Sequence, residues 1–316
     1  MIVVSGEALM DVFDAGATAT GQRLDARIGG SPLNVAVGLA RLGQPAAFFG
    51  GIGRGFLGDR LQQALAAEGV DLRCVRRVDA PTTLGLVGLD ARGVADYAFY
   101  GDGAADRALT LADLSVVPEA ATAYHFGSYA MVVQPVGGTY RALVQREWQR
   151  SVVAHDVNVR TNVQPDLAVW RDSVDFMAAH SALLKLSDED FERLYPGAAP
   201  QALAERWLAQ GVALVVMTRG GQGAWAWTAA GRLDVAPVPV QLVDTVGAGD
   251  SFQAALLSGL AERGLLHREG IARLTPDVLG EVAAFAARSA ALTCSRRGAD
   301  LPRRHELPQP KGPLPV

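Results

Sequence analysis

The strongest constraint on the fold of this chain is a regular alternation of strand-like and helix-like segments between residues 121 and 218. Short apolar runs typical of buried strands are separated by segments whose apolar residues recur at helical spacing. Such alternation predicts a parallel sheet covered by helices on both faces and connected by right-handed crossovers. The expected strands are residues 123–127, 152–157, 182–186 and 212–218, and the expected helices are residues 138–150, 167–177, 188–194 and 201–210.

Length and composition indicate a globular enzyme rather than a fibrous, membrane or nucleic-acid-binding protein. Of 316 residues, 49% are apolar and 20% are charged, and the formal net charge of −4 leaves no basic surface for nucleic acid. The first residues lack the pattern of a signal peptide, and no apolar run is long enough to span a bilayer. Cys74 and Cys294 share no metal-binding or redox spacing. We therefore expect a single domain over residues 1–316, a cytoplasmic location, and no membrane or nucleic-acid partner.

A glycine-rich stretch, Asp244-Thr245-Val246-Gly247-Ala248-Gly249-Asp250, separates an expected strand from an expected helix. The alternation of apolar residues over 238–242 predicts a strand that runs out of the sheet, and helical spacing continues from Phe252 to a stop at Gly264. Because its residues are small, the turn can point several backbone N–H groups outward at a helix N-terminus, where an anion is favoured. Asp250 is expected at the first helical position, as a functional carboxylate or as a helix cap.

Two segments carry a resemblance to a known family. DTVGAGD, at 244–250, resembles the C-terminal signature of the ribokinase/PfkB family of carbohydrate kinases, and GGSPLNVAVGLARLG, at 29–43, resembles its N-terminal signature. The resemblance implies a ribokinase-like three-layer α/β/α sandwich with a mostly parallel central sheet and a small β-strand lid. The lid would be discontinuous, formed by about residues 12–28 and 84–101. The implied activity is transfer of the γ-phosphate of ATP to a primary hydroxyl of a monosaccharide.

The catalytic centre implied by the resemblance is the glycine-rich turn. No G-x-x-x-x-G-K-[ST] motif occurs, so a P-loop is excluded and another turn must bind the phosphates. The amides of Gly247, Ala248 and Gly249 are the candidates. Asp250 would accept the proton of the attacking hydroxyl, which requires an ionised carboxylate within hydrogen-bonding reach.

The residues implied in sugar binding come from several segments. An ionised Asp11 can accept strong hydrogen bonds from substrate hydroxyls. The helix that follows the glycine pair is expected to have Ser31 as its N-cap and to close at Gly43. Arg160, in Asp156-Val157-Asn158-Val159-Arg160, is similar to the arginine of the D-x-N-x-R element of fructokinases and 2-keto-3-deoxygluconate kinases, with a structural salt bridge as the alternative. The remaining candidates are Gly29, Gly30 and Asn34, and Tyr97 and Phe99 of an expected hairpin, which stack on the sugar or pack against the main domain.

The nucleotide and metal sites are implied by position in the family pattern. Lys185-Leu186-Ser187-Asp188-Glu189-Asp190 corresponds to the N-x-x-E element, so Lys185 and Ser187 would bind ATP and Asp190 would bind Mg²⁺, through a water. Ser187 and Asp190 alternatively form a helix capping box. Thr218, Gly220 and Gly223 resemble the nucleotide-binding loop, with a plain hairpin turn as the alternative. Ala287 would border adenine, and a monovalent cation, K⁺, would bind near Asp244, Val246 and Gly298.

Fructose is the expected substrate, with 2-keto-3-deoxygluconate and ribose as alternatives within the kinase class. Outside that class, Gly53-Arg54-Gly55-Phe56-Leu57-Gly58 fits G-x-G-x-x-G and leaves open a nicotinamide-dependent oxidoreductase. Relatives often carry Arg where this chain has Gly101, and Asn where it has Ala287. Together with Asp190, these departures leave open a sugar-binding protein without catalysis. A lid hairpin can form a homodimer interface in relatives, but the sequence does not decide the oligomeric state.

Overall fold

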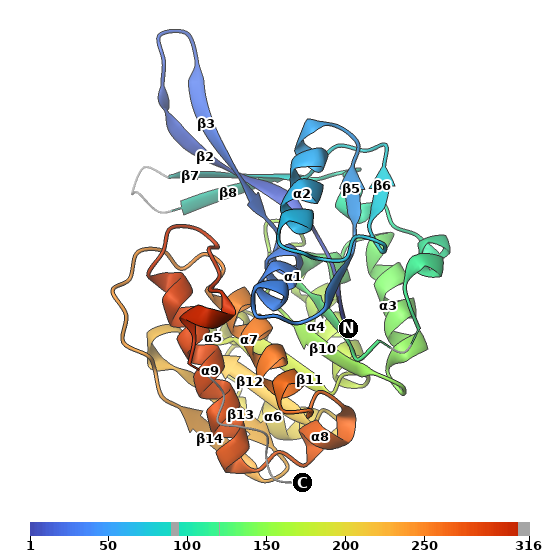
Figure 1. Cartoon of the computed structure of the whole chain (residues 1–316), viewed down its shortest axis with the longest axis vertical. Coiled ribbons are helices and arrows are strands. Elements are labelled where there is room, and N and C mark those ends of the chain that lie inside the picture. Colours follow the sequence, from blue (N-terminus) through green and yellow to red (C-terminus); the bar gives the residue numbers. More distant parts are fainter. Residues whose placement is uncertain (90–94, 120, 309–316) are drawn as a thin grey trace.

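The computed structural model describes residues 1–89, 95–119 and 121–308 and is built around an eight-stranded sheet (Figure 1). The strand order is β14-β13-β12-β11-β10-β9-β1-β4, and the pairs from β4 to β12 are parallel. Only the last two pairs, β12 with β13 and β13 with β14, are antiparallel. The predicted parallel sheet is therefore confirmed. Its strands are β1 (Ile2–Ser5), β4 (Ala46–Phe49), β9 (Ala123–Gly127), β10 (Val152–Asp156), β11 (Leu183–Ser187), β12 (Leu214–Thr218), β13 (Ala224–Thr228) and β14 (Gly231–Val235).

Helices cover both faces of this sheet and enclose two separate apolar cores, which gives three layers (Figure 1). One core is closed by α1 (Ser31–Arg41), α2 (Phe56–Ala67), α7 (Ala248–Glu262), α8 (Arg268–Ala272) and α9 (Pro276–Cys294). The other is closed by α3 (Val136–Glu147), α4 (Leu167–Ala178), α5 (Asp188–Leu194) and α6 (Pro200–Ala209). Short 3₁₀ helices connect these elements: η1 (Ala105–Arg107), η2 (Leu111–Val116), η3 (Ser128–Met131), η4 (Gly220–Gln222) and η5 (Arg304–Glu306).

A second sheet of four strands, in the order β3-β2-β7-β8, projects from the body at one end of the molecule (Figure 1). Its strands are β2 (Leu9–Ala17), β3 (Gln22–Gly29), β7 (Leu84–Leu89) and β8 (Ala95–Tyr100), and the central pair, β2 with β7, is parallel. The predicted hairpin is confirmed as the antiparallel pair β7–β8, although its turn lies outside the described residues. A two-stranded sheet of β5 (Gly51–Gly53) and β6 (Arg76–Val78) lies beside α2.

The strand expected over residues 238–242 is wrong. In the described structure this segment forms no strand, and its side chains reach solvent, with Val240 40% and Leu242 64% exposed. Pro237 and Pro239 each lack the N–H that a sheet ladder requires. This segment is therefore poorly suited to pair with a neighbouring strand, despite its alternating apolar residues. The glycine-rich turn is consequently reached from an exposed loop rather than from the sheet.

The carboxyl ends of the parallel strands meet at a single edge, where open α/β folds bind their ligands. β1 leads there into β2 of the small sheet, and β10, β11 and β12 lead into the segments that carry Arg160, Asp190 and Gly223. The segments singled out in the sequence thus converge on one side of the molecule. Among the described residues, no helix is long and apolar enough to cross a membrane.

Candidate active site

Asp250 lies buried where the first turns of α7 and α1 meet, with 8% of its surface exposed. Its Oδ1 accepts a hydrogen bond from Ser31 Oγ at 2.6 Å, and its Oδ2 accepts one from Asn34 Nδ2 at 2.8 Å. Asp250 is the third residue of α7 rather than the first, and its side chain does not cap the helix. The expectation that Ser31 caps α1 is also wrong, because Gly30 is the N-cap and the Ser31 hydroxyl is used to hold Asp250.

The turn before Asp250 has the geometry of an anion site. Gly247 is the N-cap of α7 and adopts a left-handed conformation, with φ 78°. A Cβ at Gly247 would lie 2.7 Å from the Cβ of Ala299, so the turn has room only for glycine. The 15-residue helix α7 therefore begins with backbone N–H groups that no side chain caps, where its dipole favours a negative charge.

A buried lysine faces this turn from the sheet. Lys185 Nζ donates to Asp156 Oδ2 at 2.6 Å, and both side chains are 3% exposed. The two residues are direct neighbours in the β10–β11 register, on the face that α7 covers. Nζ lies 3.6 Å from where a Cβ of Gly249 would stand, and Asp156 is its only hydrogen-bond partner among the described residues. Two of its three N–H donors thus remain for an anion held against the glycine turn.

Burial raises the pKa of Asp156 to about 6, although the Lys185 ammonium acts to lower it. The carboxylates of Asp190 and Asp250 also raise the pKa of Asp156. These three carboxylates and the Lys185 ammonium are therefore close enough to interact. Asp156 was noted in the sequence only as the start of the Asp156–Arg160 segment. Its pairing with Lys185 depends on strand register, which the sequence does not give.

Asp11 lies on β2 of the small sheet and faces the same volume. Its carboxylate occupies the space that side chains at Gly29 and Gly85 would fill, since Gly85 stands opposite it in the register. Burial raises the pKa of Asp11 to about 6, while Arg160 lowers it and Asp250 raises it. Asp11, Arg160 and Asp250 are therefore close enough to interact electrostatically, although they come from three distant parts of the chain.

The glycine pair and the aromatic residue of the small sheet border this site. Gly30 has φ 107°, and a Cβ there would lie 2.6 Å from the carbonyl oxygen of Glu7, so the chain passes close to its own backbone. Phe99 lies across from Gly85, with its ring 6.2 Å from that of Tyr129. It thus packs on the main domain at the edge of the site, and its stacking on a sugar stays a prediction. The side chain of Tyr97 lies outside the described residues.

Asp190 has a structural role that the sequence left open. It forms a capping box with Ser187 at the start of α5, and its Oδ1 also accepts the N–H of Val159 at 2.8 Å. Asp190 thereby fixes the backbone next to Arg160, whose guanidinium donates to the Val159 carbonyl. Among the described residues, no group of three or more His, Cys, Asp or Glu side chains is arranged to hold a metal. A contact of Asp190 with Mg²⁺ through water stays a prediction.

The candidate nucleotide-binding residues come from the carboxyl edge of the sheet and from helix α9. Thr218 ends β12, and Gly220 and Gly223 form the tight turn into β13, so the segment is a hairpin at the carboxyl edge. Ala287 lies on α9, partly buried against the core. Their contacts with a nucleotide stay predictions.

The three candidate cation-binding residues are brought together by one carboxylate. Asp244 accepts from the N–H of Val246 at 3.1 Å and from the N–H of Gly298 at 2.8 Å. The glycine-rich turn is thus tied to the segment after α9. Whether carbonyl oxygens there bind K⁺ is a separate prediction.

The G-x-G-x-x-G segment has a structural role, because two of its glycines allow close backbone packing. A Cβ at Gly58 would overlap the carbonyl of Gly53, and a Cβ at Gly53 would lie 2.5 Å from the carbonyl of Ala80. Arg54 points outward to an exposed ion pair with Asp79. Gly53 and Gly58 are therefore needed so that the turn can fold against its own backbone.

Glu7 was missed as a candidate. It lies two residues after the end of β1 and is 1% exposed, and burial raises its pKa to about 8. It accepts a hydrogen bond from the Ser128 side chain, and Asp106 acts to raise its pKa while Arg160 acts to lower it. A charged residue just after a short, buried strand was the available signal.

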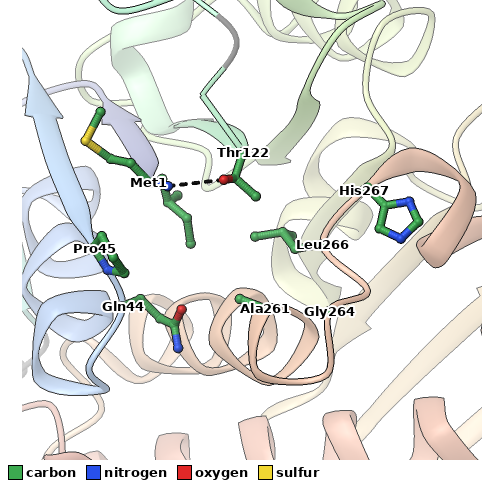
Figure 2. Close-up of a pocket in the computed structure, with 9 residues that line it drawn as sticks. Met1, Gln44, Pro45, Thr122, Ala261, Gly264, Leu266 and His267 are labelled. Carbon is green, nitrogen blue, oxygen red and sulfur yellow. Dashed lines mark hydrogen bonds between the residues drawn. The ribbon is translucent and has the colours of Figure 1, made fainter. Parts of the chain in front are cut away.

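Figure 2 shows a cavity of about 390 Å³ at the opposite edge of the sheet, where β1 begins. The N-terminal ammonium of Met1 donates to Thr122 Oγ1 at 3.1 Å beside it. None of the candidate catalytic residues lines this cavity, so we do not assign the chemistry to it. The residues that line it are Met1, Ile2, Gln44, Pro45, Thr122, Ala261, Gly264, Leu266 and His267.

Comparison with known proteins agrees with this geometry. A family model described as pfkB family carbohydrate kinase matches residues 1–306. The chain belongs to the pfkB family of carbohydrate kinases. It is 37% identical to a fructokinase of Rhizobium leguminosarum bv. trifolii, over 88% of this chain and 85% of that protein. The expected family, enzyme class and ribokinase-like fold are confirmed, and the nicotinamide-dependent oxidoreductase alternative is wrong.

Solved structures of this carbohydrate kinase family are similar across the whole chain. A fructokinase from Xylella fastidiosa with bound ATP has a TM-score of 0.85 at 25% identity, covering 94% of this chain and 93% of that one. A fructokinase from Vibrio cholerae O395 in a form with bound fructose, ADP and calcium has a TM-score of 0.78 at 25% identity and covers 94% of both chains.

Proposed function

We propose that this kinase is a fructokinase, which transfers the γ-phosphate of ATP to a primary hydroxyl of fructose. The observation that carries the proposal is Asp250, a buried carboxylate oriented by Ser31 and Asn34 beside an uncapped glycine turn and a partly unsatisfied lysine. The names of the relatives support fructose as the substrate. The alternatives within the class are 2-keto-3-deoxygluconate kinase and ribokinase.

Sugar binding is proposed for the surface between the small sheet and the start of α1. Asp11 accepts hydrogen bonds from substrate hydroxyls, and Asn34 and the backbone at Gly29 and Gly30 border the ring. Arg160 donates to sugar oxygens near Asp11, whose pKa its charge acts to lower. Phe99 completes the wall on β8, and Tyr97 of the same strand is a further candidate. The small sheet then acts as a lid over the sugar in a single domain spanning residues 1–316.

The transfer step needs little covalent work from the protein. The acceptor hydroxyl approaches Asp250, which takes its proton as the new O–P bond forms and the bond to the ADP oxygen breaks. The amides of Gly247, Ala248 and Gly249 and the free N–H donors of Lys185 stabilise the negative charge on the transferring phosphoryl group. Since these donors are already fixed, little reorganisation accompanies the reaction.

The nucleotide is proposed to lie along the edge from β11 to α9. Ser187, Thr218, Gly220 and Gly223 follow the phosphates and ribose, and Ala287 borders the base. Mg²⁺ would neutralise phosphate charge and keep most of its waters. The fit at Asp190 is through a water, because both carboxylate oxygens already accept backbone N–H groups. The carboxylate of Asp244, which joins the turn to Gly298, supports a K⁺ site there with the carbonyl of Val246.

Two further proposals concern the enzyme as a whole. Within the described residues, the outer edges of the small sheet are unpaired, and Leu24 on the edge strand β3 is 56% exposed, which supports a homodimer formed through the lid. Light scattering of wild type and Leu24→Ser would test it, with a monomeric wild type as the contrary result. The unpaired Cys74 and Cys294 suit a reducing cytoplasm.

A coupled ADP-release assay over a sugar panel tests the function. We expect turnover of fructose with ATP and Mg²⁺, weak turnover of ribose, and turnover of fructose reduced by about 10²- to 10⁴-fold in the Asp250→Asn variant. Strong turnover of 2-keto-3-deoxygluconate without turnover of fructose would reassign the substrate within the class. Absence of ADP release with every sugar, in a protein that still binds ATP, would support the non-catalytic alternative.

A further inference from the structure

The space beside Gly101 is filled by another residue. Gly101 directly follows β8, and a Cβ there would overlap Nη2 of Arg107 and lie 2.9 Å from Oγ1 of Thr83. Arg107 comes from η1, so its guanidinium reaches back to the base of the small sheet. A bulky side chain at position 101 and an arginine at position 107 therefore compete for one volume.

Strand register puts this guanidinium on the sugar-facing side of the small sheet. Asp11 stands opposite Gly85, and Gly85 stands opposite Phe99, so these three positions share one face. Thr83 precedes Gly85 by two residues and Gly101 follows Phe99 by two, which returns both to that face. The end of Arg107 that lies against Thr83 and Gly101 is thus about 7 Å along the strands from Asp11.

Arg107 has fewer partners than a buried cation normally needs. Its side chain is 13% exposed, and Nη1 pairs at 3.0 Å with Asp102, whose side chain is fully exposed. Nε is buried without a hydrogen-bond partner, and the guanidinium lies 5.6 Å from the ring centre of Tyr129. The neighbouring carboxylate of Asp106 is occupied by the hydroxyls of Thr83 and Tyr129. An exposed ion pair contributes little, so much of the cost of burying this charge is not offset within the chain.

We propose that Arg107 is a specificity-determining residue of the sugar site. Its Nη2 donates a hydrogen bond to a sugar oxygen at the end remote from the hydroxyl that receives the phosphoryl group, next to the contact made by Asp11. The inference rests on the proposed function, since it names a contact of that site.

Steady-state kinetics of Arg107→Met and Arg107→Lys test the proposal. Loss of a charged hydrogen bond should raise the sugar KM by about 10- to 100-fold in Arg107→Met, with the KM for ATP unchanged. Arg107→Lys keeps the charge without the planar fork and should give a smaller increase. Asp102→Asn is the matched control, because it removes the exposed partner of Arg107 only, and its sugar KM should stay at the wild-type value.

The outcomes separate a sugar contact from a structural role. If Arg107 only supports the fold, the melting temperature falls and the KM values for sugar and ATP move together or not at all, which would overturn the proposal. If Arg107→Met does not fold, Arg107→Lys carries the test, and an unchanged sugar KM in that variant also overturns it. Wild-type protein that turns over no sugar would instead be a failure of the proposed function.

Discussion

At the scale of single residues, the site is organised before any ligand arrives. Ser31 and Asn34 direct the Asp250 carboxylate from a neighbouring helix, and Asp156 holds Lys185 from the adjacent strand. Each functional group is therefore fixed by a side chain that is distant in sequence. Groups fixed in this way stabilise a charge in the transition state without paying for reorientation at that moment.

Replacing Asp250 by Asn tests the role of the base. The amide has nearly the same shape but cannot accept a proton, so turnover should fall by about 10²- to 10⁴-fold. Titration calorimetry should still detect both fructose and ATP, since the groups that bind them are untouched. Near-wild-type turnover in this variant would mean that Asp250 is not the base.

Replacing Lys185 by Met separates stability from catalysis. Removal of the ammonium leaves the Asp156 carboxylate buried without a partner, which should cost about 3–5 kcal/mol of unfolding free energy. The double variant Lys185→Met/Asp156→Asn removes both charges, so its urea midpoint should recover most of that loss. Its kcat should stay low, because the phosphoryl group still lacks its cation. Recovery of kcat together with stability would show that Lys185 is only structural.

The sequence predicted the identity of the charged groups better than their partners. Asn34 and Asp250 were recognisable because they stand in short glycine-containing motifs, whereas Asp11 was assigned only through the resemblance to the family. Ser31 was assigned to a helix cap, since its interaction with Asp250 spans 219 positions of the chain and has no local signature. The position of Arg107 beside Gly101 was likewise invisible, because it depends on the direction of one long side chain.

At the scale of elements, the N-termini of α1 and α7 meet and are joined by two hydrogen bonds to Asp250, one from Ser31 and one from Asn34. The helical spacing that predicted both helices, with Gly43 and Gly264 as their C-terminal stops, is confirmed. The loop before α7 was predicted wrongly, because an alternating apolar pattern does not report whether a partner strand exists. The strand–helix alternation over residues 121–218 was reliable for a different reason: each strand there is buried by helices on both faces.

Substitution of Gly247 by Ala tests the turn itself. The new Cβ would clash with Ala299, and alanine would be strained in the left-handed conformation that Gly247 adopts. The backbone amides of the turn should therefore shift. We expect kcat to fall at least about tenfold, because small displacements of positioning groups are costly. Gly264→Ala is the matched control at the other end of α7: its φ is 67°, but a Cβ there meets nothing within 4 Å. It should lose about 1 kcal/mol of stability and keep its kcat.

At the scale of the whole molecule, buried ionisable groups pull the pH dependence of stability in opposite directions. Burial raises the pKa of Glu7 from 4.5 to about 8, so its folded form is neutral at pH 7. Burial lowers the pKa of His125 to about 3 and of His155 to about 4, so both are also neutral. The interior beneath the site thus excludes charge of either sign except where a partner is provided.

These directions predict that the free energy of unfolding declines between about pH 6.5 and 8. The unfolded chain loses the Glu7 proton near pH 4.5 while the folded protein keeps it to about pH 8, so this contribution falls as the pH rises through that window. The neutral histidines act oppositely: their contribution is complete above about pH 6.5 and falls on acidification. Between about pH 6.5 and 8 the two histidines are largely neutral in both the folded and the unfolded state. Asp11 and Asp156, whose folded pKa values are about 6, are largely ionised there.

The Glu7→Gln variant isolates this alkaline window. In wild type, the free energy of unfolding measured in urea should decline from about pH 6.5 to 8, by at most about 1.4 kcal/mol per pH unit for the single group. The glutamine is neutral in both states, so the decline should be much smaller in the variant, while the slope below about pH 4.5, where Glu7 is protonated in both states, should be unchanged. Equal slopes above pH 6.5 in the two proteins would mean that Glu7 is already ionised in the folded state. The Ser128 hydroxyl and the charge of Arg160 would then outweigh the cost of burial, and the polar groups under the sugar site would form an ion pair network rather than a neutral one.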